Sequence, residues 1–204
     1  TSITIPSSVD TIKSNAFRGC ISLQSIEIPN SVFHIASSAF LGCSSLRNVT
    51  IPNSVSYIDE KVFYGCSSLD DITIPTSVNY IGEYAFAYCS GMNSLNIQGE
   101  TVLGAAAFTG CTGKLTIKLD SIPSSSSASE SPFYKSAFSS IIIDGYPTYV
   151  GDYAFAYCEY LTSITIPSSV DTIKSNAFRN CIRLHNITIP SAVNNIESYA
   201  FYNC

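Results

Sequence analysis

The 204-residue sequence has no tryptophan and one methionine, and only 12% of its residues are charged, with 10 Lys and Arg against 15 Asp and Glu. So few charges exclude a disordered acidic tail, and the lack of excess positive charge argues against a nucleic-acid-binding protein. The apolar runs are only a few residues long, so we expect neither a membrane-spanning helix nor a signal peptide within this stretch, and no direct insertion into a membrane.

Leucine is also scarce: the chain has 10 Leu against 25 Ile and 34 Ser. Isoleucine is β-branched and favours strands, whereas serine favours turns and weakens helices. The composition therefore predicts a protein of strands and turns and excludes a helical bundle.

The cysteines recur at a nearly fixed spacing along the chain. Their separations are 23, 23, 23, 22, 47, 23 and 23 residues, for Cys20, Cys43, Cys66, Cys89, Cys111, Cys158, Cys181 and Cys204. Ile-Pro and Ala-Phe pairs keep the same period, and residues 1–18 are identical to residues 162–179, a shift of seven periods of 23. A constant period in this range predicts a solenoid built by copying whole units.

The middle of the chain is irregular but returns to phase, since Phe86 and Phe155 are three periods of 23 apart. The extra length lies in the serine run Ser124–Ser131. We predict one solenoid over residues 1–204, with regular turns at 1–97, an irregular serine-rich cassette at 98–144 and regular turns at 145–204, as a piece of a longer array. About nine turns are marked by Phe17, Phe40, Phe63, Phe86, Phe108, Phe133, Phe155, Phe178 and Phe201.

Each repeat begins with a short strand. In the second repeat Ile26 and Ile28 alternate with Glu27, which predicts a strand with one buried face. Pro29 follows directly, and because proline has no N–H to donate to a ladder, we expect the strand to end there.

The second part of each repeat carries the buried aromatic ring. Ile35, Ala39, Phe40 and Cys43 have the spacing of one face of a short helical or 3-10 turn. The slot before the cysteine usually holds Gly or Asn, residues that adopt a left-handed backbone. Tyr88 and Tyr157 occupy the same slot, which favours the interpretation that a positive φ is not always required there.

The repeat unit from Ile3 to Leu23, I-x-I-P-x-S-V-x-x-I-x-x-x-A-F-x-x-C-x-x-L, resembles the BspA-like class of leucine-rich repeats. The resemblance covers the whole chain, and Thr116–Ile143 resembles a variant cassette of such arrays. It implies a right-handed leucine-rich-repeat superhelix, with a parallel β-sheet on the concave face and short helical or 3-10 turns opposite. It also implies a cell-surface or secreted protein that mediates adhesion or coaggregation by binding a protein or glycoprotein, such as a host matrix component.

No catalytic or metal-binding motif is present in the sequence. The closest cysteines are 22 residues apart, which excludes a C-x-x-C site, and we predict buried free thiols, with disulfides between adjacent turns as the alternative. His34 is expected to face solvent, and the acidic pair Asp59-Glu60 is expected in a solvated turn. These patterns predict a protein that is not an enzyme and needs no cofactor or metal.

The outward column of strand residues is the predicted contact face. It contains Thr4, Glu27, Thr50, Thr73, Asn96, Thr116, Ile142, Thr165 and Thr188, flanked by Gln24, Arg47, Asp70 and His185. A flat, hydroxyl-rich sheet can make many weak contacts with an extended ligand. Alternatives are a structural spacer that presents another domain, or a component that assembles end to end.

Two further features leave their interpretation open. Asn48-Val49-Thr50 and Asn186-Ile187-Thr188 are N-glycosylation sequons, and glycans on Asn48 or Asn186 would obstruct the predicted contact face. The tyrosines are expected mostly on the turn side of the solenoid. There they can serve as contact anchors or as packing lids.

Overall fold

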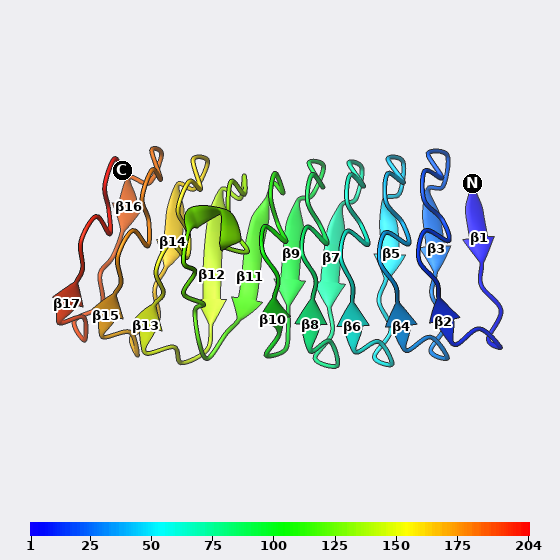
Figure 1. Ribbon diagram of the computed structural model, residues 1–204, viewed down its shortest axis with the longest axis horizontal. Coiled ribbons are helices and arrows are strands. Elements are labelled where there is room, and N and C mark those ends of the chain that lie inside the picture. Colours follow the sequence, from blue (N-terminus) through cyan, green and yellow to red (C-terminus); the bar gives the residue numbers. More distant parts are fainter.

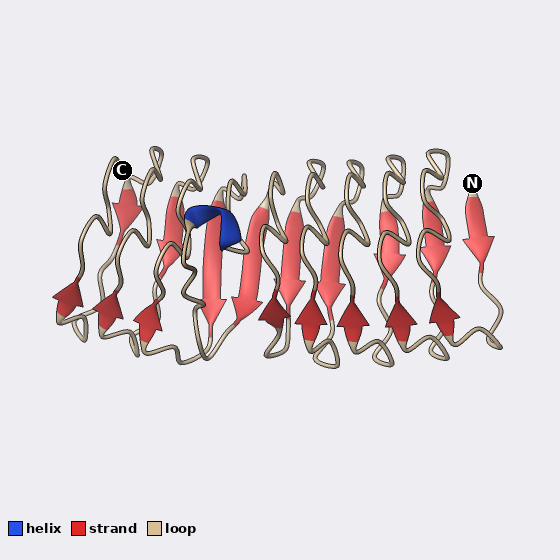
Figure 2. Cartoon of the chain, in the orientation of Figure 1, coloured by secondary structure: helices blue, strands red, loops and turns tan.

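The computed structural model describes all 204 residues and shows a solenoid of stacked, parallel-stranded coils (Figure 1). Strands and turns make up nearly the whole chain, and the one helix is a short 3-10 segment, η1 (Ala128–Glu130) (Figure 2). β16 follows β1 by 184 residues, which is eight periods of 23, and residues 187–204 form most of a ninth coil. The predicted repeat solenoid is thereby confirmed.

One side of the solenoid, the long-strand face, carries the first strand of every repeat. These strands pair in parallel within two sheets, in the orders β1-β3-β5 and β7-β9-β11-β12-β14-β16. Their bounds are β1 (Ser2–Thr4), β3 (Ser25–Glu27), β5 (Asn48–Thr50), β7 (Asp71–Ile74), β9 (Ser94–Ile97), β11 (Lys114–Lys118), β12 (Ser140–Asp144), β14 (Ser163–Thr165) and β16 (Asn186–Ile187).

A second row of two-residue strands forms the short-strand face, which the sequence analysis did not predict. These strands also pair in parallel, in the orders β2-β4-β6-β8-β10 and β13-β15-β17. Their bounds are β2 (Thr11–Ile12), β4 (His34–Ile35), β6 (Tyr57–Ile58), β8 (Tyr80–Ile81), β10 (Val102–Leu103), β13 (Tyr149–Val150), β15 (Thr172–Ile173) and β17 (Asn195–Ile196). Strands are predicted from the alternation of apolar and polar residues, and a two-residue strand is too short to show it.

Proline sets the length of the strands on the long-strand face. Proline follows the inward isoleucine in the regular repeats, where the strands have two to four residues. In the middle repeats Gln98, Lys118 and Asp144 replace it, and β9, β11 and β12 have four or five residues. Because a non-proline residue restores the N–H donor, the ladder continues: Gln98 donates its N–H to the carbonyl of Ile74 at 3.1 Å.

The core is a continuous stack of phenylalanine rings along the solenoid axis. Successive ring centroids lie 5.0 to 6.1 Å apart from Phe17 to Phe201, through the irregular middle of the chain as well. The seven rings between these two are fully buried, and Phe17 and Phe201 are partly buried. The predicted aromatic column is confirmed.

The segment around each core phenylalanine is not the helical turn that the spacing predicted. It forms consecutive hydrogen-bonded turns, in which the Ala39 N–H donates to the Ala36 carbonyl and the Cys43 N–H to the Phe40 carbonyl, both at 3.1 Å. The Phe40 N–H instead donates to the carbonyl of Val62 in the next repeat at 2.9 Å. Because this donor is used between repeats, it is not available for a helical bond within one.

Two slots of the repeat adopt a left-handed backbone, one in every repeat and the other in all but one. The slot two residues after the phenylalanine has positive φ in every repeat, including Tyr88 and Tyr157, both at φ 62°. The expectation that these tyrosines escape the requirement is therefore wrong. A second slot, two residues before the phenylalanine, also has positive φ in all repeats but that of Phe133, as at Tyr84 with φ 54°. This slot is hard to predict from the sequence, because Tyr, Lys, Ser and Ala occupy it alongside Asn.

The short-strand face is interrupted at one repeat. Ile122 is buried in the inward slot, but Pro123 follows it and cannot donate to a ladder. The short-strand face therefore has no strand between β10 and β13, and the lower row of arrows in Figure 1 has a gap there. The serine-rich segment leaves the solenoid at this point and carries η1.

A candidate contact face on the long strands

The long-strand face presents two outward columns of side chains separated by a buried one. The burial pattern of its strands alternates between exposed and buried residues, as in β5 and β7. The first column holds Ser2, Ser25, Asn48, Asp71, Ser94, Lys114, Ser140, Ser163 and Asn186. The second holds Thr4, Glu27, Thr50, Thr73, Asn96, Thr116, Ile142, Thr165 and Thr188. Within each sheet, members of a column are register partners, except that Thr188 follows the last residue of β16.

The four flanking residues of the predicted face lie beside the first column. Gln24, Arg47 and Asp70 each donate a backbone N–H to the corresponding position of the preceding repeat, as Arg47 does to the Gln24 carbonyl at 2.9 Å. Gln24, Arg47 and His185 are exposed and Asp70 is half-buried. His185 is tied to its own backbone, since its Nδ1 lies 2.7 Å from the carbonyl of Arg183.

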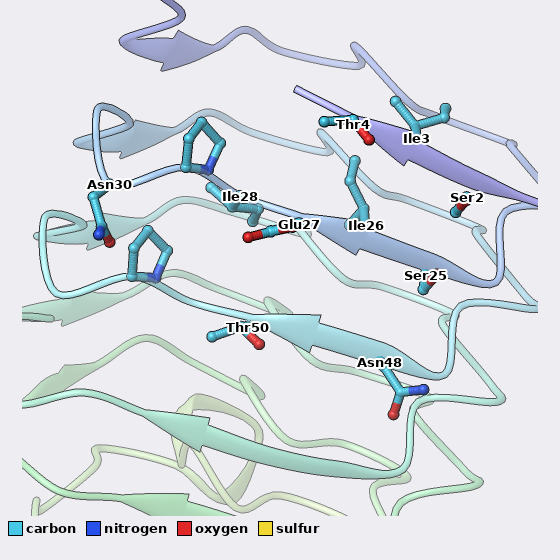
Figure 3. Close-up of a pocket in the computed structure, with 12 residues that line it drawn as sticks. Ser2, Ile3, Thr4, Ser25, Ile26, Glu27, Ile28, Asn30, Asn48 and Thr50 are labelled. Atoms are coloured by element: carbon cyan, nitrogen blue, oxygen red, sulfur yellow. The ribbon is translucent and has the colours of Figure 1, made fainter. Parts of the chain in front are cut away.

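A hollow of about 570 Å³ opens on this face over β1, β3 and β5. Figure 3 shows Thr4, Glu27 and Thr50 on the three adjacent strands, with Asn30 at the corner that follows β3. The proline corners at Pro29 and Pro52 form its edge. This hollow was not predicted from the sequence, in which the column of Ile-Pro pairs marks only the corners at its edge.

A second hollow of about 470 Å³ lies on the same face over β14 and β16. It includes Thr165, Asn186, Thr188 and Pro190. A shift of 161 residues, the distance between the two identical segments, maps β1 and β3 of the first hollow onto the residues of the second. The structure thus repeats one polar hollow at two places, and Glu27 of the first hollow becomes Thr188 in the second.

The carboxylates of this face are held by neutral donors. The Ser94 hydroxyl donates to Asp71 Oδ1 at 2.6 Å, and the Asn93 amide donates to Asp70. Glu27 is the one charged side chain among the residues that line the first hollow. The face therefore offers hydroxyl, amide and carboxylate groups, which suit many weak hydrogen bonds with an extended ligand.

Both sequon asparagines lie in these hollows with exposed side chains. Asn48 belongs to the first hollow and Asn186 to the second. A glycan on either residue would occupy the hollow itself. A glycan there would therefore block access of a ligand to the hollow.

The cysteines form a structural ladder. All eight are free thiols, and from Cys43 onward each thiol donates to the phenylalanine carbonyl of the preceding repeat, as Cys43 does to Phe17 at 3.0 Å. Burial raises the pKa of the Cys43 thiol to about 11 and that of Cys158 to about 12. Since the thiolate is the reactive form, the six buried thiols from Cys43 to Cys181 are unreactive core groups, as predicted. The two ends of the ladder differ from the prediction: Cys20 is only partly buried, and Cys204 is exposed, with its pKa lowered to about 7 by the hydrogen bond with Cys181.

Ser136 accounts for the one long interval between cysteines. It is fully buried in the cysteine slot of the Phe133 repeat, and its hydroxyl lies 3.4 Å from the Cys158 sulfur. The ladder is thus continuous, with one serine among the thiols.

The two histidines and the acidic pair Asp59-Glu60 differ in part from expectation. His34 is half-buried, and its Nε2 lies 3.0 Å from Asp59 Oδ2 on the short-strand face. Glu60 pairs with Lys61. The prediction of a solvated turn is confirmed for Glu60, which is exposed. It is wrong in part for His34 and Asp59, which are half-buried because the second row of strands brings these residues of adjacent repeats together. No group of three or more His, Cys, Asp or Glu side chains is arranged to hold a metal ion.

The family model for the BspA type leucine-rich repeat region matches residues 1–116 and 98–204, with six copies. The chain belongs to this family. A comparison with curated proteins gave no match. The structure contains no helix that is both long enough and apolar enough to cross a membrane.

Solved structures share the fold of this BspA-type chain. A leucine-rich repeat protein of T. pallidum is 22% identical, with a TM-score of 0.59 over 91% of this chain and 78% of that one. A leucine-rich repeat protein from Eubacterium ventriosum is 23% identical, with a TM-score of 0.57 over 99% of this chain and 58% of that one. The pneumococcal vaccine antigen PcpA is 19% identical, with a TM-score of 0.51 over 96% of this chain and 67% of that one.

Proposed function

We propose that this chain is a non-enzymatic adhesion segment, exposed on a cell surface or secreted, that binds a protein or glycoprotein through the long-strand face. The observation that carries this proposal is the repetition of one polar hollow at two places on that face. The family supports it at a coarser level, because leucine-rich repeats are scaffolds for binding and the relative PcpA is a vaccine antigen.

The spacing of the hollows favours a long ligand. They are related by seven repeats, and parallel strands lie about 4.8 Å apart, so their centres are separated by roughly 34 Å. Two weak sites on one rigid support bind a ligand that spans both far more tightly than either site alone. The contacts within each hollow are expected from Thr50 and Glu27 in the first and from Thr165 and Thr188 in the second.

A structural spacer that presents another domain is the second candidate. The identity of residues 1–18 with residues 162–179 favours it, because copying whole units lengthens a solenoid without designing a surface. The continuous ring stack gives such a spacer the required rigidity.

Binding to immobilised fibronectin, laminin and collagen distinguishes the two candidates. The variant Glu27→Lys/Thr50→Lys/Thr73→Lys is expected to bind at least about tenfold more weakly than the wild type to any matrix protein that the wild type retains. The control Thr11→Lys/Thr172→Lys changes two half-buried threonines on the short-strand face and is expected to leave binding unchanged.

Circular dichroism and the melting temperature establish that both variants are folded. Equal loss of binding in the two variants would overturn the assignment to the long-strand face. Absence of binding by the wild type to all three matrix proteins would favour the spacer.

A further inference from the structure

The short-strand face carries an exposed apolar stripe in its first half. His34, Tyr57, Tyr80 and Val102 are successive register partners on β4, β6, β8 and β10, and Phe33 precedes His34. Phe33 is 54% exposed, Tyr57 52% and Val102 66%, whereas His34 and Tyr80 are half-buried. We call these five residues the aromatic stripe. They lie on a different face from the hollows described above.

Elsewhere in the chain, lysine and arginine side chains stack on the faces of tyrosine rings. Five tyrosine rings are covered by a cation of the chain itself: Lys61 over Tyr84, Lys135 over Tyr134, Lys174 over Tyr149, Arg179 over Tyr202 and Arg183 over Tyr160. Tyr57 and Tyr80 of the stripe have no such partner.

The same slot in the second half provides a direct contrast. Tyr149 on β13 corresponds to Tyr57 and Tyr80, and the ammonium of Lys174 lies 3.9 Å from the centre of its ring. The next residues in that column are Thr172 and Asn195. The uncovered aromatic stripe is thus confined to the first half of the solenoid.

The charged groups around the stripe are mainly acidic. Asp10 and Glu83 are exposed, and Asp59 pairs with His34. Of the two nearby lysines, Lys61 is neutralised by Glu60, and Lys13 follows β2 at the opposite end of this sheet from Val102. The carboxylates in the repeats that carry the stripe thus outnumber the ammonium groups, so a cation that stacks on Tyr57 or Tyr80 lies in a region of net negative charge, which stabilises it.

The stripe ends in a hollow of about 260 Å³. This hollow forms where Pro123 interrupts the short-strand face, and it is lined by Val102, Leu119, Ser121 and the acidic Glu100. Three strand spacings, roughly 14 Å, separate His34 from Val102. An extended peptide advances about 3.3 Å per residue, so a segment of four or five residues covers the stripe and reaches the hollow.

We propose that the aromatic stripe binds an extended basic segment of a partner protein, with arginine or lysine side chains stacked on Tyr57 and Tyr80 and a neighbouring side chain in the hollow beside Val102. The rings supply the stacking faces, and the nearby carboxylates supply the negative charge. The segment runs along the solenoid axis, across β4, β6, β8 and β10. This site is independent of the proposed function of the long-strand face.

The test measures the fluorescence anisotropy of a labelled hexa-arginine peptide titrated with the full chain. The double variant Tyr57→Ser/Tyr80→Ser is expected to weaken binding about tenfold, and Tyr57→Phe/Tyr80→Phe is expected to retain it because the ring faces remain. Tyr149→Ser is the matched control, since its ring is already covered, and Thr50→Ala/Thr73→Ala controls for the long-strand face. Both controls are expected to bind like the wild type.

A labelled hexaglutamine peptide and cellohexaose provide the contrasting ligands. Binding of cellohexaose that depends on Tyr57 and Tyr80, without binding of hexa-arginine, would overturn the proposal in favour of a glycan site. Equal weakening by Tyr149→Ser, or no effect of Tyr57→Ser/Tyr80→Ser, would show that hexa-arginine binds through the general negative charge of the chain and would also overturn it.

Discussion

The regular repeats and the middle repeats have the same core but differ at the corner that follows the first strand. In both, the phenylalanine stack and the thiol ladder run without a break, and Ser136 fills the one slot that lacks a cysteine. The difference lies at the corner after the first strand, where the regular repeats have proline and the middle repeats have Gln98, Lys118 or Asp144. Both hollows on the long-strand face lie beside proline corners. The core residues therefore determine how the coils stack, whereas the corner residues determine the shape of the long-strand face.

Loss of one ring tests whether the core is continuous through both regions. Phe63→Ala in a regular repeat and Phe133→Ala in the irregular one are each expected to lower the free energy of unfolding by about 3–5 kcal/mol, because both rings are fully buried and leave a cavity. Urea denaturation measures both values. A cost below about 1 kcal/mol for Phe133→Ala alone would show that the stack is interrupted in the middle repeats.

Exchanging the corner residues tests the role of proline. Gln98→Pro is expected to cost roughly 1–3 kcal/mol, because it removes the N–H that donates to Ile74 and leaves that carbonyl without its partner. Pro52→Gln is expected to change stability by less than about 1 kcal/mol, since the restored N–H offsets the greater freedom of the unfolded chain. Similar costs for the two substitutions would contradict the assignment of strand length to proline.

The thiol ladder makes stability depend on pH above 9. Unfolded thiols ionise near their ordinary pKa of 9.0, whereas the folded protein keeps the proton of Cys43 to about pH 11 and that of Cys158 to about pH 12. The unfolded state thus loses protons first, and the stabilisation, complete below pH 9, is lost as the pH rises to about 11–12.

Cys43→Ala is expected to reduce the slope of the free energy of unfolding against pH by up to about 1.4 kcal/mol per pH unit between pH 9 and 11. Ser136→Ala is the control in the same column, because serine does not ionise in this range. Denaturant midpoints at pH 8, 9, 10 and 11 give the slopes. Identical slopes for Cys43→Ala and the wild type would contradict the burial of a neutral thiol.

The smallest expected effect comes from the left-handed slots. Gly42 has φ 72°, and a Cβ at this position would meet nothing closer than the Cα of Gly19 at 4.0 Å. Gly42→Ala is therefore expected to cost only the backbone strain, about 1 kcal/mol. Gly82→Ala lacks the positive φ but would place its Cβ 2.5 Å from the backbone of Asp59, so it is expected to cost more. The reverse order would show that φ, and not contact with the neighbouring repeat, dominates.

The sequence predicted the solenoid, its period and its aromatic and cysteine columns, because large buried side chains must recur wherever coils stack. It did not predict the short-strand face, since β4 and β6 have only two residues each. The prediction of helical turns was wrong. The spacing of Ile35, Ala39 and Phe40 shows which side chains are buried, but it does not show that the Phe40 N–H donates to the next repeat and not within its own. The hollows depend on the shape of proline corners, and a pattern of inward residues carries no information on that shape.

Site-specific photo-cross-linking tests the assignment of the long-strand face most directly. Benzoylphenylalanine is placed at Thr50 and Thr188, in the two hollows, and at Thr11 and Thr172 on the short-strand face, and each chain is irradiated with a bound matrix protein. We expect cross-links from Thr50 and Thr188 and none from Thr11 and Thr172. Cross-links from Thr11 or Thr172 with none from the two hollows would contradict the long-strand face as the contact surface.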